Sequence, residues 1–310
     1  MDKYKAKREA WIQRVTIEDR NSIQRQIWSM IWDAAVYRII NEARKYAKEV
    51  PEGGVELNGM VHRLIDKCFF QSQANAIRRL LDRSPAKGGK EVYSLYRLLE
   101  DIKENIHLCT RENIFATEER PYDYGPVQKE YFEYCEQQAR EGNRSIMIPP
   151  ELVWHRHEER HQDIDKLASV DKDNRSPNDT IRPEVISRLK NKLGSCREIV
   201  DYVDKFVAHA ATPESRATIK ADEITLTLGK FWDAHEVICN VANFVSKYIL
   251  GDSNIGSLAI PQYDHFAYID RPLIESENVE KLHEVWNKYE KETQSWGNWS
   301  IDDFIKDVNG

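Results

Sequence analysis

Glycine and proline are scarce in this sequence, with 13 and 11 residues in a chain of 310. Since turn-rich β architectures use many such residues, their scarcity favours long helices. The five cysteines are widely scattered without a CxxC pair, which argues against a disulfide framework and a zinc knuckle. No apolar run approaches the roughly 18 residues that span a membrane, and the charged start lacks the apolar segment of a secretory signal. These absences predict a cytoplasmic protein with reduced thiols and no membrane contact.

An excess of positive charge is also missing. Lysine and arginine number 45 against 52 aspartates and glutamates, a formal net charge of −7. This balance excludes a protein that coats nucleic acid nonspecifically, but it leaves a local basic face open. Aromatic residues make up 10% of the chain, which argues against disorder. A length of 310 residues fits one large domain or two ordinary ones.

Helical periodicity dominates the first half, so we expect an N-terminal helical lobe over residues 1–168. Three long helices are predicted in it, over residues 17–49, 58–83 and 92–105. In the first, Thr16 followed by Asp19 is typical of a capping box at the helix start. Apolar side chains then recur three or four positions apart, which predicts one buried face. This stripe consists of Ile23, Ile27, Met30, Ala34 and Tyr37.

A polar, turn-forming segment, residues 169–182, is predicted to link this lobe to a second one. The second lobe, residues 183–310, begins with a long helix at Pro183, where proline suits the first helical turn. A partner helix is expected from about Asp222 to Gly251. We therefore predict an all-α fold, a multi-helix bundle with a long antiparallel helix hairpin in its C-terminal half, in which the two lobes could form one continuous domain. The apolar seam of the first hairpin helix consists of Ile186, Leu189, Leu193, Cys196, Val200, Val203 and Val207.

The string His157-Glu158-x-x-His161 has the spacing that places two imidazoles on one helix face for zinc, with the glutamate placed to activate water. Its surroundings are polar on every side, and the neighbouring Arg156 and Arg160 would oppose a dication. A zinc hydrolase is therefore one hypothesis, and a solvated, charged helix is the more common interpretation of such a segment.

The end of the long hairpin helix carries three polar side chains, Asp204, Lys205 and His209. Lys205 and His209 are four positions apart and so share one helix face. An imidazole near the negative end of a helix dipole is favourably placed and can carry protons near neutral pH. From the residues alone, His209 is either a proton carrier or, as is more common, a cap or packing group. His235, on the apolar stripe of the partner helix, is predicted to be a buried, hydrogen-bonded core histidine.

Three segments carry a further resemblance: Tyr202–His209 (YVDKFVAH), Gln73–Arg83 (QANAIRRLLDR) and Ser94–Ile102 (SLYRLLEDI). They are similar to the HEPN superfamily (higher eukaryotes and prokaryotes nucleotide-binding), in particular to its bacterial AbiU-like branch, named after a phage abortive-infection protein. The resemblance extends over about Ile17 to Leu250. It implies an all-α bundle, often dimeric, and a cytoplasmic protein of bacterial defence or toxin–antitoxin type.

The resemblance also implies a site and partners. Nuclease members of the family cut RNA without a metal, using an arginine and a histidine a few residues apart. On this basis His209 is the candidate acid–base residue, Asp204 its polar neighbour, and Lys205 a point charge for the phosphate. The arginine position of the motif is occupied by Val203, which lies on the apolar seam. A non-catalytic HEPN-like dimerisation or interaction module is therefore the alternative to a ribonuclease.

A local basic face would supply the remaining contacts to RNA. Arg79 and Arg83 are four positions apart on one predicted helix, and Arg97 lies on the next, so these three are candidate phosphate-binding residues. A solvated face balanced by nearby acidic residues is the common alternative. We expect no cofactor, and as partners a second copy of the chain, RNA and a protein from a defence operon.

Overall fold

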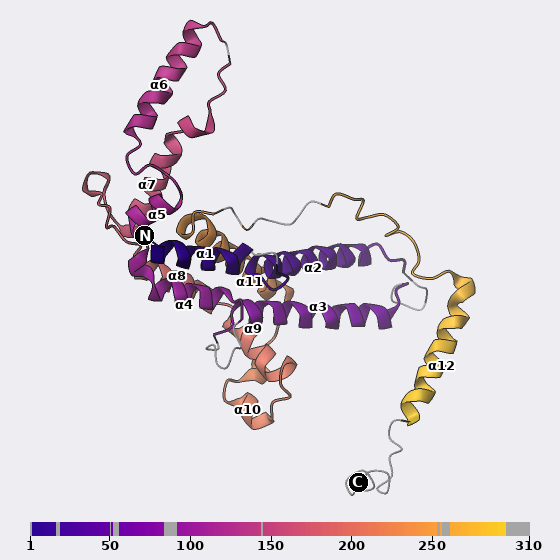
Figure 1. The fold of residues 1–310 in the computed structure, drawn as a ribbon. Coiled ribbons are helices and arrows are strands. Elements are labelled where there is room, and N and C mark those ends of the chain that lie inside the picture. Colours follow the sequence, from indigo (N-terminus) through magenta and orange to yellow (C-terminus); the bar gives the residue numbers. More distant parts are fainter. Residues whose placement is uncertain are drawn as a thin grey trace, which may run out of the picture. The chain divides into compact units, whose positions relative to one another are not determined.

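The computed structural model describes residues 2–16, 19–49, 51, 56–83, 92–143, 145–252, 255 and 261–295. The fold is all-α, as predicted: helices dominate these residues, no β-strand forms among them, and an isolated antiparallel bridge joins Thr110 and Thr180 (Figure 1). The chain divides into two compact units, Met1–Ala259 and Ile260–Gly310. Each unit is described by itself.

The first two helices, α1 (Asp2–Thr16) and α2 (Ile23–Arg44), correct one predicted boundary. Thr16 is the last residue of α1, where its hydroxyl donates to the carbonyl of Ile12. Helix α2 starts after Ser22, whose hydroxyl oxygen accepts from the backbone amide of Arg25 and satisfies one of the unpaired donors of the first turn. The predicted capping box at Thr16 is therefore wrong. The predicted stripe is confirmed, since every member is buried: Ile23, Ile27, Met30, Ala34 and Tyr37.

Helices α3 (Gly59–Leu80) and α4 (Leu95–Glu104) follow, each capped by a side chain, Asn58 and Ser94. Helix α3 packs along α2 (Figure 1). Their contact includes the rings of Tyr37 and Phe69, which stack with centroids 3.7 Å apart. The Tyr37 hydroxyl donates to Asp66 at 2.7 Å, so the polar end of this buried tyrosine is satisfied. One face of α4 is completely buried, formed by Leu95, Leu98, Leu99 and Ile102.

The middle of the chain forms shorter helices: η1 (Ile106–Leu108), α5 (Arg111–Thr117), α6 (Gly125–Arg140), η2 (Pro150–Leu152), α7 (His155–Ala168) and η3 (Lys172–Asn174). Helix α6 buries none of its described side chains, whereas α7 buries Arg160, His161, Ile164 and Leu167. Two of the four buried residues of α7 are polar, and this is unusual for a helix face that meets a core. These two polar residues, Arg160 and His161, take part in the charged contacts described below.

The first hairpin helix is not continuous. It consists of α8 (Pro183–Gly194), α9 (Arg197–Tyr202) and the π-helix η4 (Val203–Val207). The break falls at Ser195 and Cys196, where the backbone leaves the α-helical hydrogen-bonding pattern.

The connection to the second hairpin helix contains α10 (Pro213–Ala217) and η5 (Ala221–Glu223). The partner helix α11 (Leu228–Phe244) starts later than predicted, and Thr227 supplies the capping oxygen of its first turn. Helix α11 also ends in a π-helix, η6 (Val245–Ile249), and it packs against α8.

One large hydrophobic cluster contains residues of both predicted lobes. Its buried residues run from Tyr4 in α1 to Ile255 after η6, and they include Ile181, at the end of the segment expected to be a linker. The boundary between the two compact units falls after Ala259.

The second unit contains η7 (Ser276–Asn278) and α12 (Val279–Ser295). Apolar side chains on α12 recur at helical spacing and are exposed: Val279, Leu282, Val285, Trp286 and Tyr289. Among the described residues of the whole chain, no helix is long and apolar enough to cross a membrane.

Candidate functional site

His209 lies on the turn that follows η4 and is exposed to solvent. The amide of Ala208 donates to the carbonyl of Val203 at 2.8 Å, which closes the wider π-helical turn before it. Such π-turns occur frequently at functional sites. Val203 itself has none of its surface exposed, so it belongs to the core.

An arginine reaches this helix end from another helix. Arg78, near the end of α3, donates from Nε to Oδ1 of Asp204 at 2.5 Å, and both side chains are about one third exposed, at 32% and 34%. Asp204, the residue that follows Val203, thus holds the guanidinium of Arg78 at this helix end. Sequence analysis did not assign Arg78 to the site, because no local pattern links positions that are 126 residues apart.

The turn that carries His209 is held by two further cations. Lys205 donates to the hydroxyl of Ser215 at 2.8 Å. Arg216 donates to the carbonyl of Ala211 at 2.8 Å and lies over the ring of Phe206, 5.6 Å from its centroid. Lys205 and Arg216 therefore both face the segment between η4 and α10, and they give it positive charge.

The three arginines predicted to bind phosphate do not form one cluster. Arg79 is exposed and borders a pocket that also contains Asp19 and Asp82. Arg83 and Arg97 line a different pocket, of about 420 Å³. The end of α3 thus directs consecutive arginines to separate places, and Arg78 is the one that contacts the segment of His209.

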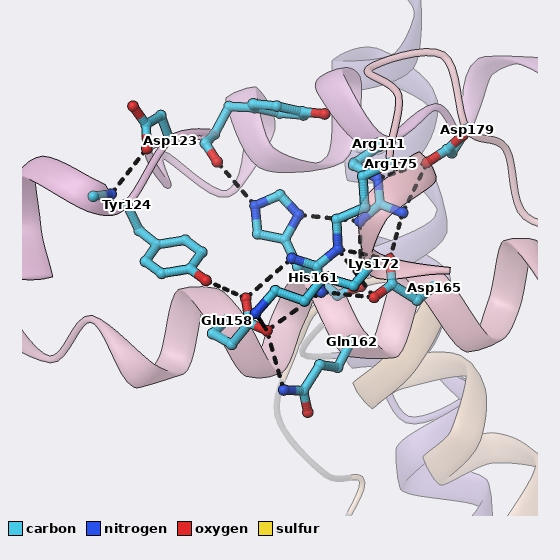
Figure 2. Close-up of polar contacts among 12 residues, drawn as sticks. Arg111, Asp123, Tyr124, Glu158, His161, Gln162, Asp165, Lys172, Arg175 and Asp179 are labelled. Carbon is cyan, nitrogen blue, oxygen red and sulfur yellow. Dashed lines mark hydrogen bonds and ion pairs between the residues drawn. The ribbon is translucent and has the colours of Figure 1, made fainter. Parts of the chain in front are cut away.

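His161 of the zinc-like string is a buried polar hub (Figure 2). Its Nδ1 accepts from Nη1 of Arg111 at 3.0 Å, since a guanidinium can only donate, so Nε2 carries the proton and donates to the carbonyl of Tyr122 at 2.9 Å. The ring stacks on Phe115 with centroids 4.1 Å apart. Burial, with the charges of Arg175 and Arg111, lowers the pKa of His161 and keeps the ring neutral. No lone pair remains for a metal.

Glu158 is equally occupied. It accepts from the hydroxyl of Tyr124, from Arg175 Nη1 at 3.0 Å and from Gln162 at 3.2 Å (Figure 2). Burial acts to raise the pKa of Glu158, but the hydrogen bonds from Arg175 and Tyr124 outweigh it and lower the value to about 2. A carboxylate held in this way is a poor proton acceptor. His157 is half-buried beside Arg120, whose charge adds to burial in lowering the pKa of His157.

The string therefore serves packing and charge pairing rather than metal binding. In the described part of the chain, no three His, Cys, Asp or Glu side chains come together in a way that could hold a metal ion.

Sequence analysis missed the centre of this network, Arg111, whose side chain has no exposed surface. Its Nη2 lies 2.7 Å from Asp165 and its Nε donates to Asp179 at 3.0 Å (Figure 2). Arg175 donates to Asp165 from two nitrogens, Nε and Nη2, at 3.0 and 2.7 Å. Arg175 and Asp179 belong to the segment expected to be a linker. Its polarity, which suggested exposure, instead provides partners for a buried arginine.

No known family model matches this sequence, and the characterised proteins and solved structures provide no match either. The functional inference therefore depends on the geometry of the described residues.

His235 is buried in α11, as predicted, but its Nε2 has no hydrogen-bond partner among the described residues. Its ring lies 5.5 Å from that of Trp232. Burial, followed by the positive charge of Arg38, lowers the pKa of His235 to about 4. A neutral imidazole is therefore part of the folded core, and protonation opposes folding.

This burial gives a testable pH dependence. The unfolded chain binds a proton at His235 near pH 6.5, whereas the folded chain does so only near pH 4. Lowering the pH through this window should thus cost stability, by up to about 3 kcal/mol. In urea unfolding between pH 4 and 7, His235→Leu should flatten this acid dependence, while His107→Gln at an exposed position should retain it. An equally steep loss in His235→Leu and wild type would refute this origin.

Proposed function

We propose that the chain is an RNA-binding protein of bacterial defence type that cleaves RNA without a metal, with His209 as its acid–base residue. The observation that carries this proposal is the ion pair between Arg78 and Asp204. It brings a guanidinium from α3 to the helix end that bears an exposed imidazole and Lys205. Two cations at the helix end that precedes an exposed histidine fit the needs of phosphate binding and proton transfer.

The chemistry uses the 2′-hydroxyl of the RNA itself. His209 removes the proton of this hydroxyl as the 2′-oxygen attacks the adjacent phosphorus. The 2′-O–P bond forms, the P–O5′ bond breaks, and the departing 5′-oxygen takes a proton from solvent. Lys205 and Arg78 stabilise the extra negative charge that develops on the phosphate oxygens. The products are a 2′,3′-cyclic phosphate and a 5′-hydroxyl end.

The decisive experiment incubates the purified chain with tRNA and mRNA in EDTA. We expect cleavage to persist in EDTA and to leave 2′,3′-cyclic phosphate ends. His209→Ala should lower the rate by at least about 100-fold, the usual contribution of a positioned acid–base group, whereas His107→Ala, at an exposed position of η1, should not. Arg78→Gln should weaken cleavage, and Arg63→Gln, at the opposite end of α3, serves as its matched control. Absence of cleavage at high protein concentration would contradict the proposal.

A second candidate is a non-catalytic interaction module. It is favoured by the exposed apolar stripe of α12, which includes Leu282, Trp286 and Tyr289. An exposed apolar face of this kind is typical of a protein–protein contact. A chain that cleaves no RNA, yet sediments as a dimer whose stability depends on Trp286, would support this function instead of the first.

A further inference from the structure

A charged pocket of about 420 Å³ lies between α1 and α4, beside the end of α3. Four of its lining side chains are cationic and three are acidic. Its volume is within the range of sites that hold small ligands. It is lined by Lys7, Arg14, Arg83, Tyr96, Arg97, Glu100, Asp101 and Glu104.

Two of the acidic side chains are already neutralised. Asp101 accepts from Lys7 at 2.8 Å and from the indole of Trp11 at 3.1 Å, and Arg14 lies 3.2 Å away. Burial acts to raise the pKa of Asp101, but the hydrogen bonds from Lys7 and Trp11 outweigh it and lower the pKa. Glu100 forms an ion pair with Lys190. Asp101 and Glu100 therefore compensate Lys7, Arg14 and Lys190, while the third acidic side chain, Glu104, is exposed and pairs with neither Arg83 nor Arg97 among the described residues.

Arg83 and Arg97 are the uncompensated cations. Neither has a carboxylate partner among the described residues. Nη1 of Arg97 is buried and has no hydrogen-bond partner there. A buried donor on a charged group that lacks an acceptor is expensive, and native proteins rarely leave one unsatisfied. The guanidinium of Arg83 lies over the ring of Tyr96, 4.4 Å from its centroid, which fixes this second cation at the pocket.

We propose that this pocket binds a phosphomonoester, with Arg97 and Arg83 as its ligands. Two uncompensated guanidiniums match the charge of a phosphomonoester, about −1.5 to −2 at neutral pH, better than the single charge of a phosphodiester. The planar fork of arginine suits bidentate contact with phosphate oxygens. The phosphate comes from a free nucleotide or from the 5′ end of an RNA, which share this group. The site is separate from His209 and does not require cleavage.

The test measures binding and thermal stability of the full chain with inorganic phosphate, with AMP, and with an RNA oligonucleotide bearing a 5′-phosphate or a 5′-hydroxyl. Sodium chloride keeps the ionic strength constant, since screening alone changes charged contacts. We expect phosphate to raise the melting temperature of the wild type by mass action. Arg97→Gln should lower the affinity by about 10–100-fold, the effect of losing charge-assisted hydrogen bonds, and Arg63→Gln should bind like the wild type.

The ligand-free proteins provide the second readout. Because Arg97→Gln removes a buried donor that has no partner, its melting temperature without phosphate should equal or exceed that of the wild type, so weaker binding cannot be ascribed to unfolding. Equal response to AMP and inorganic phosphate would identify a free phosphorylated ligand, and preference for the 5′-phosphorylated oligonucleotide would identify an RNA end. No phosphate binding by the wild type, or equal binding by Arg97→Gln, would overturn the proposal. His209→Ala should bind phosphate normally, so failure of cleavage and failure of this pocket are distinguishable.

Discussion

Replacing Arg111 with leucine should lower the free energy of unfolding by about 3–5 kcal/mol, because it leaves buried carboxylates without their partner. The side chain has no exposed surface, and its three nitrogens contact Asp179, Asp165 and His161. Loss of the guanidinium also leaves Nδ1 of His161 without its donor. Urea unfolding at neutral pH measures this change, and one of this size is a large fraction of the about 5–15 kcal/mol that stabilises a typical domain.

Two further substitutions separate charge from geometry. Arg111→Lys keeps the positive charge, but a single ammonium group cannot reach all three acceptors. This variant should therefore still lose about 2 kcal/mol of folding free energy. Arg140 is a matched control: it is also ion-paired, with Glu136 at 2.6 Å, but the two side chains are 76% and 65% exposed. Arg140→Leu should change stability by less than about 0.5 kcal/mol. Equal effects of Arg111→Leu and Arg140→Leu would show that the network adds no stability.

Alanine at Gly251 should destabilise the fold by about 3–5 kcal/mol, for two combined reasons. Gly251 has φ +63°, a left-handed conformation that disfavours any side chain. A Cβ there would also overlap Oε1 of Glu118 and lie 3.2 Å from Nη2 of Arg160. These two residues form a buried ion pair of 2.6 Å, with only 4% and 6% of the side chains exposed. Displacing Glu118 would break this pair, which is costly in a dry environment.

Gly142 isolates the backbone part of this effect. It has φ +78°, also left-handed, but a Cβ there would meet no atom within 4 Å. Gly142→Ala should therefore lose only about 1 kcal/mol. Thermal or urea unfolding of both variants gives the difference, which reports the contact with Glu118. If the two alanines cost the same, the ion pair is insensitive to Gly251.

The helices that sequence patterns predict well are those whose buried face repeats over several turns, such as α2 and α4. Boundaries were predicted less well, because several residues near a helix start can supply a capping oxygen. Thr16 and Ser22 both have a suitable hydroxyl, and only tertiary packing decides that Ser22 begins α2. The break before α9 was missed for a related reason: Leu193, Cys196 and Val200 remain buried on one side whether or not the helix is continuous.

The polar contacts were beyond prediction because they join distant segments. Arg78 and Asp204 are 126 positions apart, and no helical or strand period relates them. Composition was misleading at Arg175 and Asp179, since a polar stretch is typical of an exposed loop, whereas here it surrounds Arg111. The zinc-like spacing of His157 and His161 reflects a true property, a shared helix face. The spacing alone does not reveal the neighbours of His161, which come from α5 and from the backbone at Tyr122.

The π-helix η4 has a consequence for the direction in which the chain presents His209. A π-turn holds one residue more than the α-turn it replaces. Removing one residue from 203–207 would restore α-helical spacing and rotate everything that follows by about 100° around the helix axis. The direction of His209 relative to the side on which Arg78 meets Asp204 would change with it. The single extra residue in this turn therefore sets the angular register between the imidazole and the arginine of α3.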